Sequence, residues 1–156
     1  MEYGSDDDGD ATARQLLKKA YVLTGYGHFD RAIAVCEKAS RRKGGEILAP
    51  TIRAAILTAS GRPKKAMRIL FRLHRQNREA ILVSLYLAEA CFLAGRQRRG
   101  WKVLDSIDAE ALADSPWREF ENQLRQTWQA QDKLDDWPQP LTVSMGDDLP
   151  GAEDKE

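Results

Sequence analysis

Small and apolar side chains recur along this chain at a constant interval. The segment GHFDRA begins at Gly27, GRPKKA at Gly61 and GRQRRG at Gly95, so the two intervals between the glycines are equal. Further columns with the same interval are Ala20, Ala54 and Ala88; Leu23, Leu57 and Cys91; Ala32, Ala66 and Gly100; Cys36, Leu70 and Leu104; and Ala39, Leu73 and Ile107. A fixed period of this length is typical of repeat architectures. The pattern therefore predicts three copies of one unit, ending near Asp114.

Each copy is expected to form two helices. In the third copy one apolar face consists of Leu82, Leu85, Ala88, Glu89 and Phe92, and a second face consists of Trp101, Leu104 and Ile107. Both faces have helical spacing, and Gly95 between them allows the backbone to leave the first helix. The small residue five positions after each glycine is expected where the two helices cross, because a bulky side chain there would separate them.

A further helix is predicted after the third copy. Ser115 is a suitable N-cap and Pro116 suits the first helical position. The residues spaced for its apolar face are Trp117, Phe120 or Glu121, Leu124 and Trp128. Repeat stacks need a helix that covers their open end. We therefore interpret these aromatic residues as part of the core, with a partner-binding surface as the alternative.

The predicted fold class is all-α, with a folded domain over residues 12–136 between two acidic tails, 1–11 and 137–156. The tails combine clustered acids with prolines and glycines, a composition typical of disorder. The formal net charge of zero divides into −5 over residues 1–13, +15 over 14–104 and −10 over 105–156. This charge distribution has two interpretations. The basic segment 14–104 attracts an anionic partner, or the acidic ends screen that segment from contact with nucleic acid.

The composition also predicts where the protein resides. It is 42% hydrophobic, and no apolar run approaches the roughly 18 residues of a membrane span. The first residues lack the basic and apolar regions of a secretory signal. We expect a soluble, cytoplasmic protein without membrane insertion, in which Cys36 and Cys91 are reduced core thiols.

No constellation in the sequence indicates catalysis. His28 and His74 are far apart in the sequence and have no carboxylates at metal-ligand spacing. The glycine-containing turns, including the arginine-rich one that starts at Gly95, lack the GxxxxGK[ST] ending of a phosphate-binding loop. We therefore expect no enzyme activity, no metal and no cofactor.

The repeated helix-turn-helix unit, with a period of about 34 residues, resembles the tetratricopeptide repeat (TPR) family. The family usually has a Trp near the start of the first helix, and this chain has Leu16, Pro50 and Ser84 there. Where the family usually has a Gly, this chain has Ala20, Ala54 and Ala88, and the family's usual closing Pro is missing. The resemblance implies a right-handed superhelix in which the first helix of each pair lines a concave groove.

On that mapping the groove is mostly apolar. Its residues would be Leu17, Tyr21, Leu48, Thr51, Ala55, Thr58, Leu82, Leu85, Glu89 and Phe92. Family members that bind the terminal carboxylate of heat-shock chaperones use Lys and Asn at places that here carry Leu17, Tyr21, Thr51 and Ala55, which argues against that partner. An amphipathic helix or an extended apolar segment suits such a groove. The alternative, that these residues are interhelical core, stays open.

A basic ridge of Lys65, Arg68, Arg72 and Arg75 is predicted on the second helix of the second copy. The family resemblance places this helix on the convex side. The ridge is interpreted as a solvated face, a docking site for an acidic tail, or a nucleic-acid site. The lack of a stacking aromatic among these arginines argues against nucleic acid.

The size and layout are similar to the small TPR chaperones of bacterial type III secretion systems. SLYLAEACFLAGRQRRGWKVLDSID is similar to their last repeat, and IRAAILTASGRPKKAMRILFRL resembles a middle one. The resemblance implies that the protein sequesters an amphipathic segment of a needle or translocator subunit until secretion. The alternatives are a general assembly adaptor or a nucleic-acid-associated scaffold.

The predicted stack has no covering helix before its first copy. The apolar start of that copy, Leu16 and Leu17, follows only the acidic tail. Uncovered ends of repeat stacks pair with a second copy or with a partner. A homodimer is therefore among the expected assemblies.

Overall fold

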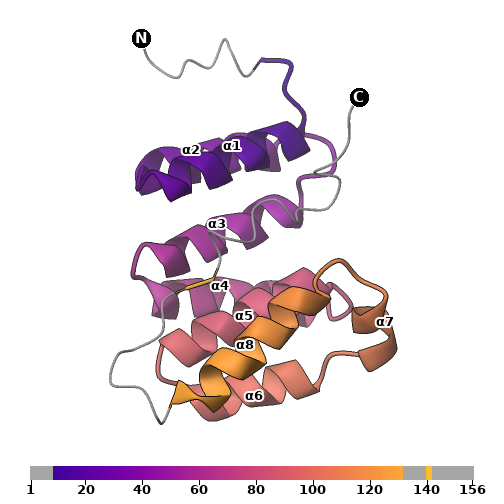
Figure 1. Ribbon diagram of the computed structural model, residues 1–156. Coiled ribbons are helices and arrows are strands. Elements are labelled where there is room, and N and C mark those ends of the chain that lie inside the picture. Colours follow the sequence, from indigo (N-terminus) through magenta and orange to yellow (C-terminus); the bar gives the residue numbers. More distant parts are fainter. Residues whose placement is uncertain (1–8, 132–139, 142–156) are drawn as a thin grey trace.

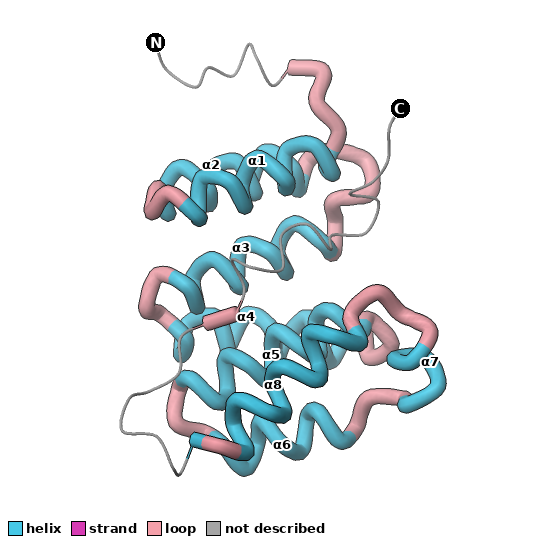
Figure 2. Tube along the Cα trace, in the orientation of Figure 1, coloured by secondary structure: helices cyan, strands magenta, loops and turns pink. Residues whose placement is uncertain are grey.

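The computed structural model describes residues 9–131 and 140–141, and within these residues it is all-helical (Figures 1 and 2). The helices are α1 (Ala13–Gly25), α2 (Phe29–Ser40), α3 (Leu48–Ala59), α4 (Pro63–Gln76), α5 (Ile81–Leu93), α6 (Gln97–Asp105), α7 (Ala109–Ala113) and α8 (Arg118–Gln129). The predicted all-α class is confirmed. The greater part of the two acidic tails lies outside the described residues.

The repeat interval of the sequence corresponds to three helix hairpins, α1–α2, α3–α4 and α5–α6. The first helix of each ends before a glycine in the left-handed region, with φ of 81° at Gly27, 91° at Gly61 and 84° at Gly95. The residue after each glycine donates its N–H to a carbonyl five residues earlier, at 2.8–2.9 Å: His28 to Leu23, Arg62 to Leu57 and Arg96 to Cys91. This is a recurrent helix C-cap that requires positive φ, which confirms the role predicted for the glycines.

The hairpins stack as successive layers, visible in Figure 1. The first helices form a continuous row, in which α3 contacts both α1 and α5. Each second helix also packs against the next first helix, α2 on α3 and α4 on α5. α8 contacts α5 and so extends the row beyond the third hairpin.

The closing helix buries the face that the sequence predicted. Phe120 and Leu124 are fully buried, and Trp117 and Trp128 are almost so. Their interpretation as core residues is confirmed. Because the end of the α5–α6 hairpin would otherwise expose apolar side chains, this burial stabilises the whole stack.

Small residues allow the helices of each hairpin to cross closely. Ala32 and Ala66 are fully buried, and Gly100 is buried on α6. A Cβ atom on Gly100 would lie 2.7 Å from the ring of Phe92. That separation is shorter than van der Waals contact, so the aromatic ring on α5 takes the space of a side chain on α6.

The start of the closing helix differs from the prediction. α8 begins at Arg118 with Trp117 as its N-cap, so Ser115 and Pro116 lie in the preceding turn. The reason is α7, a short helix that the sequence pattern did not reveal. The Ser115 hydroxyl donates to the Leu112 carbonyl at the end of α7 (2.9 Å) and accepts the Trp117 N–H (3.1 Å). Ser115 therefore ends one helix instead of starting the next.

The predicted domain start coincides with the cap of α1. The Thr12 hydroxyl accepts the Gln15 N–H and the Gln15 side chain accepts the Thr12 N–H, which together form a capping box. Arg42, between α2 and α3, donates to the Ala11 carbonyl at 2.9 Å. None of the helices within the described ranges is long and apolar enough to span a membrane.

Candidate partner-binding face

The residues predicted to line a groove all lie on the row of first helices. Leu17 and Tyr21 are on α1; Leu48, Thr51, Ala55 and Thr58 are on α3; and Leu82, Leu85, Glu89 and Phe92 are on α5. The structure brings them together on adjacent helices but buries all of them except Leu48, which is partly exposed. In the described part of the chain these side chains are therefore mostly enclosed, and Leu48 keeps partial exposure.

Two tyrosines bridge the row from end to end. Tyr21 on α1 and Tyr86 on α5 form a hydrogen bond between their hydroxyls, although they are 65 residues apart and α3 lies between their helices. Ala55 occupies on α3 the position that Tyr21 occupies on α1. Tyr86 was not among the predicted groove residues.

Threonine hydroxyls on α3 are satisfied within the helix. Thr51 donates to the Ile47 carbonyl at 2.7 Å and Thr58 donates to the Ala54 carbonyl at 3.2 Å. Each hydroxyl therefore binds a carbonyl group of the preceding helical turn. The contribution of these residues to the row is therefore mainly apolar.

Aromatic contacts cover the α5 part of the row. Phe92 stacks on Trp128 of α8, with ring centroids 5.0 Å apart, and meets Trp101 of α6 edge-on at 5.2 Å. Tyr86 meets Phe120 of α8 edge-on at 5.3 Å. Such pairs add stability beyond the apolar area that they bury. Phe92 is consequently a core residue that α8 separates from solvent.

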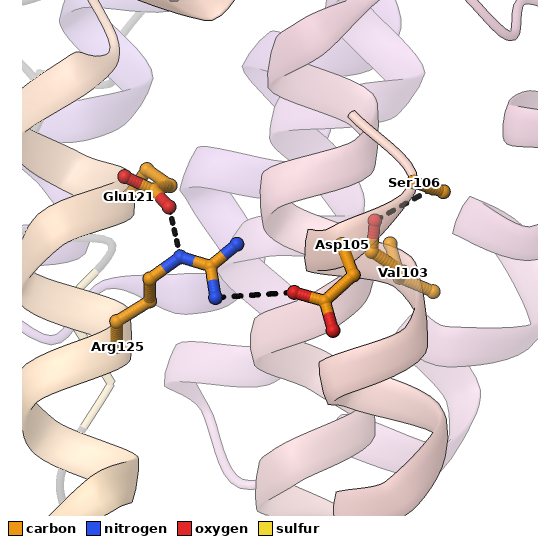
Figure 3. Close-up of polar contacts among 5 residues, drawn as sticks. All are labelled: Val103, Asp105, Ser106, Glu121 and Arg125. Atoms are coloured by element: carbon orange, nitrogen blue, oxygen red, sulfur yellow. Dashed lines mark hydrogen bonds and ion pairs between the residues drawn. The ribbon is translucent and has the colours of Figure 1, made fainter. Parts of the chain in front are cut away.

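A salt-bridged arginine fixes the outer side of α8 to α6 (Figure 3). Arg125 binds Glu121 one turn earlier on α8 and, at 3.2 Å, Asp105 at the end of α6. Burial lowers the pKa of Arg125, but its hydrogen bond with Glu121 and the charges of Glu121 and Asp105 raise it above its usual value. The guanidinium also lies 5.9 Å from the centre of the Trp101 ring. The arginine is permanently charged and orients α8 over α6.

Glu89 is a buried carboxylate on α5 that contacts a distant part of the chain. It is 2% exposed, and one of its oxygens accepts the backbone N–H of Leu141 at 2.6 Å. Leu141 is partly buried and packs against the apolar core. A segment 52 residues along the chain thus lies against a residue predicted to line the groove.

An open apolar pocket lies between α3 and α5, at the N-terminal ends of these two helices. Its volume is about 290 Å³. The lining comprises Gly44, Ile47, Leu48, Thr51, Ala80, Ile81, Leu82, Val83 and Trp117. The pocket is therefore formed by the N-terminal ends of α3 and α5 and by the residue that caps α8. It contains three of the predicted groove residues, Leu48, Thr51 and Leu82.

An exposed isoleucine contributes to this pocket. The side chain of Ile47, which caps α3, is 43% exposed. The volume is at the lower end of the roughly 300–1,000 Å³ typical of ligand sites. The sequence did not indicate Ile47 or Trp117 as pocket residues, because the loop and helix that carry them meet only in the fold.

The four ridge residues lie together on the exposed side of α4. Lys65, Arg68, Arg72 and Arg75 are all exposed, whereas Ala66, Met67 and Leu70 on the same helix are buried. Phe71 is also 37% exposed there, and the guanidinium of Arg99 on α6 lies 5.1 Å from the centre of its ring. The expectation that no aromatic accompanies these arginines was therefore wrong.

The first hairpin has exposed apolar side chains at places other than those predicted. Leu16 and Leu17 are buried, because α1 packs against α2 and α3. Val22 and Tyr26 are instead 58% and 77% exposed. The expectation that Leu16 and Leu17 form an uncovered apolar end is therefore wrong, because both belong to the core.

The histidines and cysteines do not converge on one site. His74 lies 3.3 Å from the Ser84 hydroxyl, and burial followed by the Arg78 charge lowers its pKa. Desolvation raises the pKa of Cys36 to about 12 and that of Cys91 to about 11, so both are protonated thiols at neutral pH. Both are buried, as predicted. Within residues 9–131 and 140–141, no group of three His, Cys, Asp or Glu side chains could hold a metal ion.

Comparison with protein-family models, with curated protein sequences and with solved structures returns no match. The described residues define the class directly, as a helical-repeat-like all-α protein with an apolar pocket between the N-terminal ends of α3 and α5.

Proposed function

We propose that this protein is a non-catalytic, TPR-like module that binds a segment of another protein at the row of first helices. The observation that carries this proposal is the open apolar pocket between α3 and α5, with the exposed side chain of Ile47 in its lining. Exposed apolar surface next to a pocket is typical of protein–protein interaction sites.

The TPR-like reading is supported by the repeated turn geometry. The three evenly spaced glycines, Gly27, Gly61 and Gly95, have similar positive φ angles and are followed by the same C-cap hydrogen bond. In a TPR-like stack the first helices of successive pairs lie side by side on the inner side. The contacts of α3 with α1 and α5 support that arrangement. A right-handed superhelix is the arrangement that we propose for these hairpins.

The proposed partner carries an amphipathic helix or an extended apolar segment. One of its apolar side chains enters the pocket and contacts Leu48 and Leu82, while its flanking residues lie against Ile47. Burying one such side chain contributes roughly 1.5–3 kcal/mol. The pocket thus supplies an anchor, and the neighbouring surface determines how much longer a segment is bound.

The specific role that we propose is that of a cytoplasmic chaperone. The client would be a type III secretion needle or translocator subunit, whose amphipathic segment is sequestered until export. A general assembly adaptor uses the same face without the secretion client. The identity of the captured protein distinguishes these two roles.

The test uses tagged wild-type protein and two matched surface variants in pull-downs from the native host, washed at high salt. We expect the wild type and Val22→Asp to retain one protein and Ile47→Asp to lose it, because both side chains are exposed but only Ile47 lines the pocket. Circular dichroism verifies that all three are folded. Equal capture by Ile47→Asp and Val22→Asp would contradict the proposed site.

The exposed ring of Phe71 among the basic residues favours nucleic acid as the second candidate partner. Arginines beside an exposed aromatic ring are a feature of single-strand binding surfaces. This candidate predicts that affinity falls by roughly 300-fold or more between 50 and 200 mM salt if six or more phosphates of a single strand are neutralised. It also predicts that Arg68→Glu and Arg72→Glu abolish binding while Ile47→Asp has no effect.

A further inference from the structure

The contact between Leu141 and Glu89 joins the C-terminal region to α5 in the row of first helices. Glu89 lies on α5 at the position that Tyr21 occupies on α1 and Ala55 on α3, so it belongs to the face on which the hairpins meet. In Figure 1 the described segment 140–141, drawn in yellow, lies between the levels of α3 and α5 in this view.

The chemistry of the contact is that of peptide recognition. A buried carboxyl group needs hydrogen-bond partners, and one of its oxygens accepts the Leu141 N–H in a short bond of 2.6 Å. Pro140 has no N–H and a fixed φ, so this dipeptide presents one donor from a preordered backbone. The Leu141 side chain packs against the core at the same time. A backbone donor and an adjacent apolar side chain are therefore bound together.

The length of chain between α8 and this segment permits the contact. Nine residue steps separate Gln131, where the first described range ends, from Pro140. A fully extended chain of that length spans up to roughly 30 Å. Because the segment is tethered, its effective concentration is of millimolar order, so the contact is well populated if its intrinsic Kd lies below about 1 mM.

We propose that the Pro140–Leu141 segment is a built-in occupant of the partner-binding face, with Glu89 as the residue that anchors its backbone. Leu82 in the pocket and Glu89 lie on one face of α5, two helical turns and roughly 10 Å apart. A partner segment that extends from the pocket along α5 would then compete with the chain's own segment and displace it. This consequence for partner binding depends on the proposed function, whereas the intramolecular contact does not. The segment also indicates the chemistry of the competitor, an extended apolar segment with a free backbone N–H next to an apolar side chain.

The first test measures amide hydrogen exchange of Leu141 by NMR in the full-length protein. We expect this amide to exchange at least about tenfold more slowly than in a free peptide of residues 136–146, because it is hydrogen-bonded. Glu89→Gln, which removes the charge of the acceptor, is expected to reduce that protection. Glu79→Gln is the matched control, since Glu79 is an exposed glutamate. An unprotected Leu141 amide in the wild type overturns the proposal.

The second test does not depend on altering a buried residue. Leu141→Pro removes the donor N–H in the full chain at a position outside all the described helices. A fluorescently labelled peptide of residues 136–146 is expected to bind this variant at least about tenfold more tightly than the wild type, because the internal competitor is weakened. Leu149→Pro is the control for a proline elsewhere in the same region. Equal binding to wild type and Leu141→Pro overturns the proposal.

The two proposals fail in different ways. An unprotected Leu141 amide together with a partner that Ile47→Asp releases overturns internal occupancy and leaves the proposed function intact. A protected Leu141 amide without any partner that depends on Ile47 supports internal occupancy and counts against the proposed function.

Discussion

Two neighbouring helices, α4 and α5, show how differently one repeat protein can use its sequence. In α4 only Ala66, Met67 and Leu70 are buried, and its basic residues lie in solvent. In α5 every residue from Leu82 to Phe92 is buried. The reason is position, since α5 is surrounded by α3, α4, α6 and α8, whereas α4 packs against α3 and α5.

This difference determines what a hydrophobic pattern can reveal. A helix with one apolar stripe indicates which side faces the core, as α4 does. A helix that is apolar on all sides predicts only that it is buried. The positions of Leu82, Leu85 and Phe92 on α5 therefore could not be divided into groove and core by spacing. The two helices should respond very differently to substitution.

The largest effect is expected for Leu85→Asp in α5. Leu85 is fully buried, so an aspartate there places an unpaired charge in the core. We expect a loss of more than about 4 kcal/mol in the free energy of unfolding, measured by urea denaturation followed by circular dichroism. Leu85→Met, which conserves volume, should cost less than about 1.5 kcal/mol. A folded Leu85→Asp variant of nearly wild-type stability would show that α5 is less enclosed than described.

An intermediate effect is expected for Gly100→Ala, where α6 crosses α5. The added Cβ would meet the Phe92 ring at 2.7 Å, and such overpacking costs about 1–3 kcal/mol. The same denaturation measurement applies. In a Phe92→Leu background the cost should fall, with a coupling of at least about 0.5 kcal/mol. Additive losses would mean that the ring does not occupy the space above Gly100.

The smallest effect is expected for Arg72→Glu on α4. Arg72 is exposed, so the substitution should change the free energy of unfolding by no more than about 0.5 kcal/mol. Leu70→Ala on the same helix should cost about 2–5 kcal/mol, because Leu70 is fully buried. A destabilisation by Arg72→Glu comparable to that of Leu70→Ala would contradict the assignment of the faces of α4.

Features that depend on local spacing were predictable from the sequence. The interval between Gly27, Gly61 and Gly95 is sufficient to place three turns, because positive φ is a local requirement that glycine meets. The buried aromatic face of α8 was also predictable, because its residues have helical spacing. α7 was not, because five residues are too few to establish a helical period.

Features that depend on tertiary contact were not predictable. The pocket combines Ile47 with Trp117, which lie far apart in the sequence. No sequence pattern around either residue indicates a pocket. The Glu89–Leu141 hydrogen bond joins a helix to a proline-containing segment that has no helical or strand pattern. Tyr86 was missed because every side of α5 is buried. The spacing of apolar residues along α5 therefore could not indicate which of them faces Tyr21 on α1.

The hydroxyl bond between Tyr21 and Tyr86 has a consequence for how the protein unfolds. In an ideal solenoid each repeat interacts only with its neighbours, and an end repeat can detach by itself. Here the first and third hairpins are linked directly across the second. Detaching the first hairpin breaks a contact with the third, so we expect the three hairpins to unfold together in one cooperative transition. The chain would then behave as a closed globular domain despite its repeated construction.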